Sequence, residues 1–209
     1  MVANSSEDKC YRRVAGASMK TGPARAGTAS VAMVTLHAAS TSALSTSFLS
    51  DVRALLDTAF EGDFTDEDWN HAVGGVHVWL SGSRGLISHG SLVERTFACS
   101  GQTLHVGYVE AVATAPALRH KGHGATVMKQ IGELIREHYA LGVLSTGTHA
   151  FYETCGWEKW RGPTFVDGPR GRARTPGDDG GVMILRTSCS PHLDLDGEIV
   201  CDWRLGDVW

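Results

Sequence analysis

The stretch that decides the fold is "LRHKGHGATVM", residues 118–128. It places cations and glycines directly before a run with helical spacing, because Met128, Ile131 and Ile135 recur at intervals of three and four. The first N–H groups of a helix lack partners within the helix, and the helix dipole adds positive charge there. Glycines let this main chain approach an anion closely. The stretch therefore predicts a site for a phosphate-bearing ligand.

Other anion-binding loops match less well. A Walker loop needs G-x-x-x-x-G-K-[ST], and a dinucleotide-binding loop needs G-x-G-x-x-G after an early strand. His120 and His123 form an H-x-x-H pair without a third ligand, and the five cysteines include no C-x-x-C pair, so no metal site is predicted. Taken alone, the stretch at 118–128 also fits a glycine-rich turn with incidental charges.

Composition indicates an ordinary globular protein. The chain has 209 residues, of which 42% are hydrophobic and 20% charged, which suits one domain with a substantial core. A net charge of −4 argues against a nucleic-acid binder or an anionic-membrane binder. The sequence has no apolar run of membrane-spanning length and no signal peptide. We therefore expect a cytoplasmic location, with no nucleic acid and no membrane as partner.

The chain divides into an N-terminal extension and one domain. Residues 1–30 carry scattered cations among small polar residues without periodicity, which predicts a disordered extension. Residues 31–209 are expected to form the single domain. Within it, patterning predicts strands at 31–39, 75–81, 85–99, 103–114, 141–146 and 181–186, and helices at 48–60, after 124 and at 148–155.

Connections and caps complete the predicted fold class. Thr65 and Asp68 resemble a capping box that opens a further short helix. The links "SGSRG" (81–85) and "SGQ" (100–102) are short and contain glycine, as hairpin turns do. Strands interrupted by single helices predict an α+β fold with a mixed sheet, antiparallel first and partly parallel later.

Two motifs together resemble a known family. The pattern Arg-x-x-Gly-x-Gly at 119–124, between "YVEAVAT" and an amphipathic helix, resembles the acetyl-CoA signature of the GCN5-related N-acetyltransferase (GNAT) superfamily, and so does "FYETCGW" (151–157). The segments "GDFTDEDW" (62–69), "GYVEAVA" (107–113), "RTPGDDG" (174–180) and "CDWRLGDVW" (201–209) are similar to aminoglycoside 2'-N-acetyltransferases. The similarity extends in order from about residue 33 to Trp209.

This resemblance implies a fold, a cofactor and a reaction. It implies the GNAT acyltransferase fold, with a parallel splayed pair of strands at the cofactor site, and a homodimer. It implies direct transfer of acetyl from acetyl-CoA to the 2'-amino group of aminoglycoside antibiotics. The loop would hold the pyrophosphate, the preceding strand would pair with the pantetheine arm, and the N–H near Val112 would polarise the thioester carbonyl. The implied cofactor residues are Val112, Ala113, Thr114, Arg119, His120, Lys121, Gly122, His123, Gly124 and Ala125.

Two residues are the predicted catalytic groups. Strand alternation places Glu110 on the face of Val106, Tyr108 and Val112, and a carboxylate among apolar neighbours needs a partner or a task. Glu110 is the predicted general base, acting directly or through water; a glutamate that faces solvent is the alternative. The resemblance implies that Tyr152, a phenol with a reference pKa near 10, is the general acid, and an ordinary core tyrosine is the alternative.

Acidic residues are the predicted contacts for a polycationic substrate. Five acidic side chains and one basic one, Arg204, follow residue 193. A solvated acidic tail would rarely contain Trp203 and Trp209, so we expect a packed end that faces the substrate. The predicted substrate-binding residues are Asp63, Asp68, Glu110, Ser145, Asp178, Asp179, Asp207 and Trp209.

One departure and two rival functions complete the predictions. Ala111 stands where the resemblance leads us to expect glycine. A GNAT enzyme for another amino sugar or polyamine-like metabolite is the first rival function. A non-catalytic protein that sequesters aminoglycosides is the second, and it would bind the drug without turnover.

Overall fold

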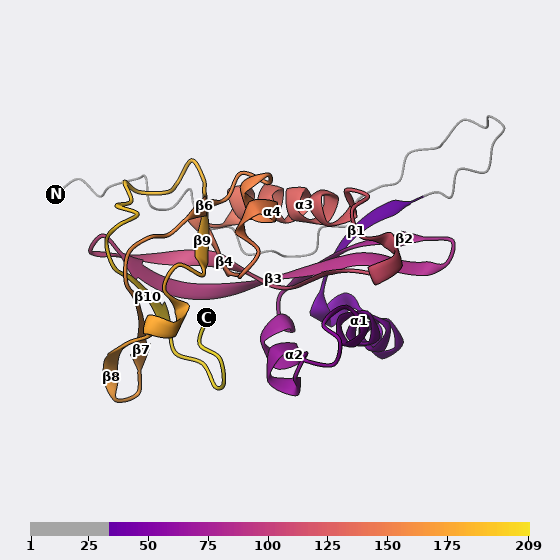
Figure 1. Cartoon of the computed structure of the whole chain (residues 1–209), viewed down its shortest axis with the longest axis horizontal. Coiled ribbons are helices and arrows are strands. Elements are labelled where there is room, and N and C mark those ends of the chain that lie inside the picture. The colour runs from indigo at the N-terminus through magenta and orange to yellow at the C-terminus, as the bar shows by residue number, and fades with distance from the viewer. Residues whose placement is uncertain (1–33) are drawn as a thin grey trace.

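The computed structural model describes residues 34–209 (Figure 1). The predicted extension at 1–30, and the start of the predicted strand at 31–39, lie outside the described residues. The strands are β1 (Thr35–Ser40), β2 (Val76–Gly82), β3 (Gly85–Cys99), β4 (Gln102–Thr114), β5 (Leu141–Ser145), β6 (Glu158–Lys159), β7 (Thr164–Gly168), β8 (Gly171–Arg174), β9 (Val182–Arg186) and β10 (Ile199–Asp202). The helices are α1 (Thr46–Ala59), α2 (Asp66–Ala72), α3 (His123–His138) and α4 (His149–Glu153), with short 3₁₀ turns η2 (Thr41–Ala43), η3 (Pro116–Leu118) and η4 (Pro176–Asp178).

The described strands form one mixed sheet in which the long strand β3 joins two halves. The first part of β3 pairs with β2, which pairs with β1, and its last part pairs with β10. On its other side lies β4, followed by β5, β9 and β6, while β7 and β8 lie beyond β10. Strands β1 to β4 are antiparallel, whereas β4–β5 and β10–β7 are parallel pairs. The predicted α+β class with a mixed sheet is confirmed.

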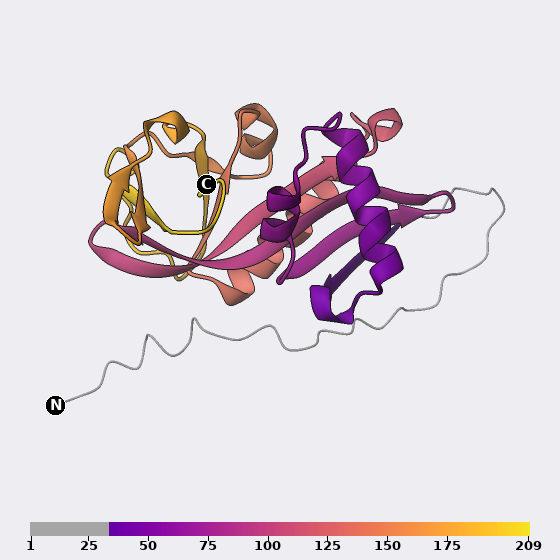
Figure 2. The same ribbon diagram turned by 90° about the horizontal axis from the view of Figure 1, so that it is seen from below.

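Helices cover both faces of the sheet. Figure 1 shows α3 and α4 on one face and α1 and α2 on the other, and Figure 2 shows α1 lying across the strands. Helix α1 is capped by the Ser45 side chain and buries Val52, Leu55 and Leu56. Helix α2 opens with the predicted capping box, in which Thr65 and Asp68 each accept from the other's main-chain N–H. This prediction is confirmed.

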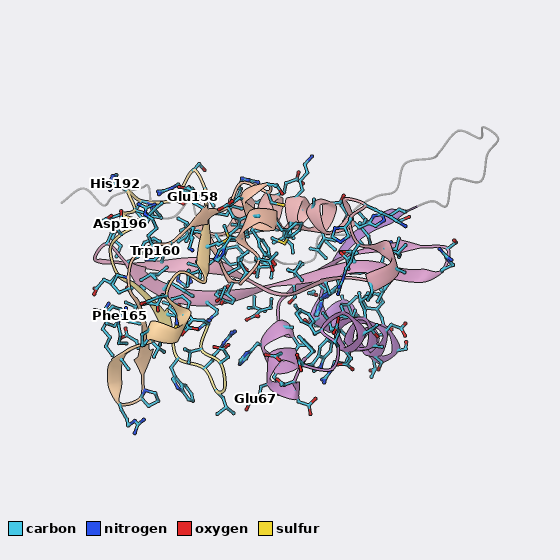
Figure 3. The ribbon with its side chains drawn as sticks, in the orientation of Figure 1. Glu67, Glu158, Trp160, Phe165, His192 and Asp196 are labelled. Atoms are coloured by element: carbon cyan, nitrogen blue, oxygen red, sulfur yellow. The ribbon has the colours of Figure 1, made fainter. Side chains whose placement is uncertain are left out.

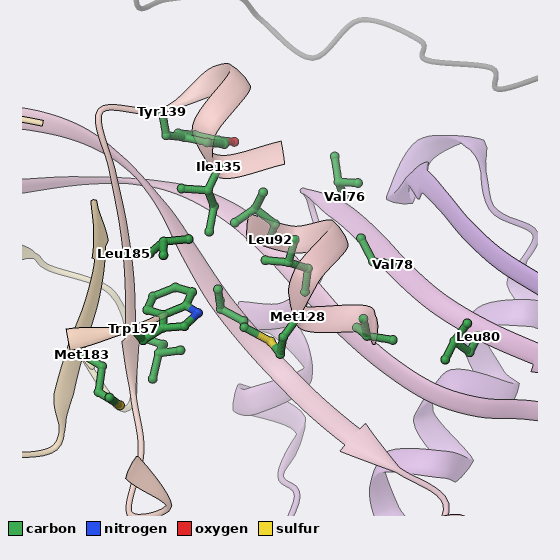
Figure 4. Packing of buried hydrophobic residues seen from close by; sticks show 14 of the residues in the cluster. Val76, Val78, Leu80, Leu92, Met128, Ile135, Tyr139, Trp157, Met183 and Leu185 are labelled. Atoms are coloured by element: carbon green, nitrogen blue, oxygen red, sulfur yellow. The ribbon is translucent and has the colours of Figure 1, made fainter. Parts of the chain in front are cut away.

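The largest hydrophobic cluster fixes α3 to the sheet. Met128 and Ile135 of α3 pack with Leu92, Trp157 and Leu185, all buried (Figure 4). Complete burial of each such side chain contributes about 1.5–3 kcal/mol. The start of α3 is therefore held firmly beside the end of β4, where the anion-binding loop lies.

The structure contains four strands that the sequence analysis did not predict: β6, β7, β8 and β10. The longest of them has 5 residues, which is too short for alternation to distinguish a strand from a loop. Within residues 34–209, no helix combines the length and apolar character that crossing a membrane requires.

Candidate active site

The loop that begins α3 has the geometry of an anion site. Gly122 is the N-cap residue with φ 80°, and His120 also has a positive φ of 62°. A Cβ on Gly124 would lie 3.3 Å from both the Phe151 ring and the Thr114 hydroxyl, so only glycine fits there without displacing a neighbour. The first N–H groups of α3 have no acceptor within the helix and remain available to a ligand.

Arg119 connects this loop to the other face of the sheet. Its Nη2 donates to the Ala59 carbonyl, at the end of α1, over 2.7 Å. One guanidinium group has five N–H donors, so this bond leaves others for a bound anion. The connection fixes the loop to α1 and keeps a positive charge beside the start of α3.

Strands β4 and β5 separate next to the loop. Their parallel pairing covers only Val106–Tyr108 and Leu141–Val143, although both strands continue further. The main chain of β4 beyond Tyr108 is therefore not used by β5. This is the predicted splayed pair, and a ligand arm can form hydrogen bonds with β4 there.

A β-bulge changes the direction of β4 at the same place. Ser91 of β3 pairs with Glu110, but His89 pairs with Ala113, so β4 contains one residue more than β3 between these pairs. Ala111 sits in the bulge with φ 52°, a left-handed conformation that costs an alanine about 1 kcal/mol or more. This conformation explains why glycine is the expected residue at position 111.

The bulge overturns the predicted alternation along β4. Val112 packs with Val109 on the side of α3, whereas Glu110 contacts Arg204, whose guanidinium lies over Tyr108. The prediction that Val112 shares the face of Glu110 and Tyr108 is wrong, because the extra residue moves the side chains that follow to the other face.

A cavity of about 1070 Å³ lies at the bulge, and acidic and cationic groups both line it. It contacts the predicted substrate residues Asp63, Asp68, Glu110 and Ser145, and it contacts Tyr152. The loop residues Arg119, His120, Gly122, His123, Gly124 and Ala125 also line it, as do Val112, Ala113 and Thr114 of β4. Lys121 is the one predicted cofactor residue that does not. Thr146, Thr148 and Phe151 line the cavity without having been predicted.

Glu110 forms an ion pair inside this site. Its Oε1 accepts from Nη1 of Arg204 at 2.5 Å, and the two side chains are only 17% and 15% exposed. Burial raises the pKa of Glu110, and the charge and hydrogen bond of Arg204 oppose that rise. Arg204 also donates to the main-chain oxygens of Asp207 and Trp209. The sequence did not assign Arg204 a role, although it is the single cation among the acids that follow residue 193.

Tyr152 contacts both the cavity and the core. Its ring lies edge-on to Phe151 and Trp157, with centroids 4.9 Å and 6.4 Å away. Burial raises the pKa of Tyr152 to about 12, and the adjacent Cys155 contributes to the rise. At neutral pH the phenol is protonated, so it can donate a proton. The core position and the proton-donor role are therefore compatible.

Comparison with known proteins identifies the family. The family model of the acetyltransferase (GNAT) domain matches residues 40–160, more than half of the chain. The curated aminoglycoside 2'-N-acetyltransferase of Mycolicibacterium fortuitum is 42% identical over 161 residues, which are 75% of this chain and 83% of the relative. The chain belongs to the GNAT acetyltransferase family.

Solved structures of a GNAT enzyme and of a probable N-acyltransferase share this fold. The GNAT family N-acetyltransferase YhbS of Escherichia coli, crystallised in complex with CoA, aligns with a TM-score of 0.57 over 84% of this chain and 93% of its own, at 15% identity. A probable N-acyltransferase of Enterococcus faecalis aligns with a TM-score of 0.51 at 18% identity over 63% of this chain. That protein is longer, and the present chain spans 33% of its length.

Three of the acids predicted to bind substrate lie outside the cavity of this GNAT domain. Asp179 accepts hydrogen bonds from Arg174 and Thr164, and the Arg174 guanidinium lowers the pKa of Asp179 to about 2. Burial raises the pKa of Asp178, and the negative charge of Asp207 adds to the rise. The charge of Asp179 is thus already paired with Arg174 within the protein, whereas Asp178 and Asp207 are near enough to repel each other.

The C-terminal residues of the GNAT domain are packed at Trp209, as predicted, but Trp203 is exposed. Trp209 is 4% exposed, lies edge-on to Phe97 with a centroid distance of 5.5 Å, and donates from Nε1 to the Thr175 hydroxyl. Trp203 is 49% exposed, so the expectation that it is packed is wrong. It follows residue 202 in a loop that leaves the sheet.

Other contacts fix this C-terminal loop beside α2. Arg95 of β3, 5% exposed, donates to the Val208 carbonyl at 2.8 Å. His71 of α2 contacts the Leu205 carbonyl at 2.7 Å, and Figure 3 shows Glu67 of α2 next to the same loop. The loop therefore spans from the sheet to α2 across the face on which Glu110 lies. Within residues 34–209, no cluster of metal-ligating side chains adds a metal to this site.

Proposed function

We propose that this protein transfers the acetyl group of acetyl-CoA to the 2'-amino group of an aminoglycoside antibiotic. The observation that carries the proposal is the cavity lined both by a cationic helix start and by Asp63, Asp68 and Glu110. The named activity of the 42% identical relative supports the position of transfer. Aminoglycosides are polycations, which an acidic wall attracts.

The chain's own residues fit a diphosphate ligand. The tight packing at Gly124 and the left-handed Gly122 bring the start of α3 to the cavity without a side chain in the way. Arg119 supplies positive charge beside the cavity. Bound acetyl-CoA would supply the acetyl group as a thioester. Val112, in the bulge, is the residue whose N–H we assign to the thioester oxygen.

Glu110 is the proposed general base. The 2'-ammonium must lose a proton before its nitrogen can form a bond to the acetyl carbon, and a carboxylate with a raised pKa accepts it, directly or through water. The ion pair with Arg204 favours the ionised form of the carboxyl group and fixes one of its oxygens. The other oxygen, Oε2, is the one we assign to proton transfer.

Tyr152 is the proposed general acid. Its protonated phenol lines the same cavity, and the Oη proton would pass to the sulfur as the carbon–sulfur bond breaks. The nearby thiol of Cys155 is a poor nucleophile, because burial raises its pKa. Transfer within a ternary complex therefore needs no acyl-enzyme.

Two antibiotics that differ at one group test the proposal. Kanamycin B carries a 2'-amino group and kanamycin A a 2'-hydroxyl. Incubation with acetyl-CoA should release free thiol with kanamycin B but not with kanamycin A, and NMR of the product should place acetyl at the 2' nitrogen. Glu110→Gln should bind the drug without turnover. Tight drug binding by the wild type without thiol release would instead favour a sequestering protein, and faster acetylation of other amino sugars a metabolic enzyme.

Location and assembly follow from the same proposal. We place the protein in the cytoplasm, where acetyl-CoA is available, and expect a homodimer with a small molecule as its partner. Neither nucleic acid nor a membrane suits its net charge of −4. Size-exclusion chromatography with light scattering tests the dimer.

A further inference from the structure

Three buried polar side chains of β3 hold the carbonyl groups of β4 around the bulge. Ser91 donates to the Glu110 carbonyl at 3.2 Å, and Ser88 donates to the Ala113 carbonyl at 2.9 Å. Between them, Nδ1 of His89 lies 3.0 Å from the Ala111 carbonyl. The bulge interrupts the regular ladder at this place, and side chains replace the missing main-chain bonds.

His89 is in turn held by a second histidine. His77 of β2 is 0% exposed, as is His89, and its Nδ1 lies 2.9 Å from Nε2 of His89. On its other side, Nε2 of His77 lies 2.9 Å from the Thr41 hydroxyl. A chain of hydrogen bonds thus runs from Thr41 to the carbonyl of Ala111, a residue in the wall of the cavity.

In this series of hydrogen bonds, each donor must point toward the Ala111 carbonyl. A carbonyl only accepts, so Nδ1 of His89 must carry a proton. Burial lowers the pKa of His89 to about 3 and that of His77 to about 4, so both rings are neutral at neutral pH. Nε2 of His89 is then an acceptor, and Nδ1 of His77 is its donor. Nε2 of His77 then accepts from the Thr41 hydroxyl, and the Gly75 carbonyl, 3.2 Å from the same hydroxyl oxygen, competes for that one proton. Both rings are therefore Nδ1–H tautomers.

We infer that His89, oriented by His77, is a positioning residue for acetyl transfer, because it holds the Ala111 carbonyl and so keeps the β4 bulge in its catalytic shape. The left-handed Ala111 conformation is strained and needs such a restraint. The bulge places the side chain of Glu110 on one face of β4 and that of Val112 on the other, and it sets the course of the main chain between them. This inference rests on the proposed function, since Glu110 and Val112 matter through the reaction assigned to them.

Two substitutions at one position separate positioning from simple stability. In His89→Asn the amide nitrogen replaces Nδ1 and can still donate to Ala111. In His89→Gln the side-chain amide reaches the place of Nε2 and loses that donor. We expect His89→Gln to lower kcat by about 10- to 100-fold, as displaced catalytic groups do, with the KM for acetyl-CoA nearly unchanged. His89→Asn should keep most of kcat even if its Tm falls further.

Nitrogen NMR of the wild-type protein tests the chain independently of activity. Long-range ¹⁵N–¹H correlation should show a proton on Nδ1, and a bare Nε2, in the rings of His77 and His89. A proton on Nε2 of His89 would overturn the inference, as would full kcat in a folded His89→Gln protein. If His89→Gln does not fold, the protonated nitrogens that NMR finds in His77 and His89 of the wild type test the inference instead. Absence of drug acetylation by the wild type would reject the proposed function and leave the NMR test intact.

Discussion

Replacing Arg204 with methionine would remove the positive charge beside Glu110 while keeping a side chain of similar length. The guanidinium lies 2.5 Å from Glu110 Oε1, and both side chains are less than one fifth exposed, so water screens the pair weakly. An opposite charge this close lowers a carboxyl pKa by about 1–3 units, which corresponds to about 1.4–4 kcal/mol.

The expected result is a shift in the pH dependence of the reaction. Burial already raises the pKa of Glu110, and without Arg204 only the smaller effects of His71 and Arg95 oppose that rise. The base would then stay protonated up to higher pH. The acid limb of kcat/KM should therefore move up by about 1–3 pH units in Arg204→Met.

Thiol release at low drug concentration, followed from acidic to alkaline pH, measures this limb. Arg204→Lys is the matched control, because it restores the charge without the planar group that also contacts Asp207 and Trp209. Its limb should return toward that of the wild type. An unchanged limb in a folded Arg204→Met protein, or one at lower pH, would refute the reasoning.

Further substitutions test other parts of the site. Tyr152→Phe should lower kcat by about 10²-fold or more and leave the KM for acetyl-CoA unchanged in steady-state assays, and a near-normal kcat would exclude it as the proton donor. Gly124→Val should weaken CoA binding at least tenfold by calorimetry, since its side chain would meet neighbours already 3.3 Å from a Cβ; unaltered affinity would place the ligand elsewhere. Ala111→Gly should raise the free energy of unfolding by up to about 1 kcal/mol in urea, because it relieves the positive φ, and a clear loss of stability would contradict that account. Finally, the unfolded chain binds more protons than the native one below the ordinary histidine pKa, so stability should fall as pH drops from about 6.5 to 4, by roughly 3 kcal/mol for His77 alone. His77→Asn should flatten that slope in urea melts at several pH values, and an equal slope would argue against a neutral buried ring.

Local patterns were enough to predict most of the fold. Helix α3 follows from the spacing of Met128, Ile131 and Ile135, and the capping box at Thr65 and Asp68 gives the start of α2. Short turns with glycine located the hairpins of β2, β3 and β4. Each of these features depends on residues close together in sequence, which is why one sequence suffices.

Contacts between distant segments could not be predicted in this way. Glu110 and Arg204 are 94 positions apart, and only the insertion of β10 beside β3 brings them together. The bulge at Ala111 escaped alternation because nothing in the residue types shows an extra residue in one strand of a pair. His77 and His89 belong to separate strands, and their contact depends on the register of that hairpin.

The place of β10 between β3 and β7 affects how the protein can be produced. Its residues pair with both neighbours, and they come later in the chain than every other strand of the described sheet. A chain cut before Ile199 would lack β10, so β3 and β7 would each have an unpaired edge. Unpaired strand edges form hydrogen bonds with those of other molecules. Prematurely ended or proteolysed copies should therefore aggregate. Full-length copies should join these aggregates only before their own β10 has paired with β3 and β7.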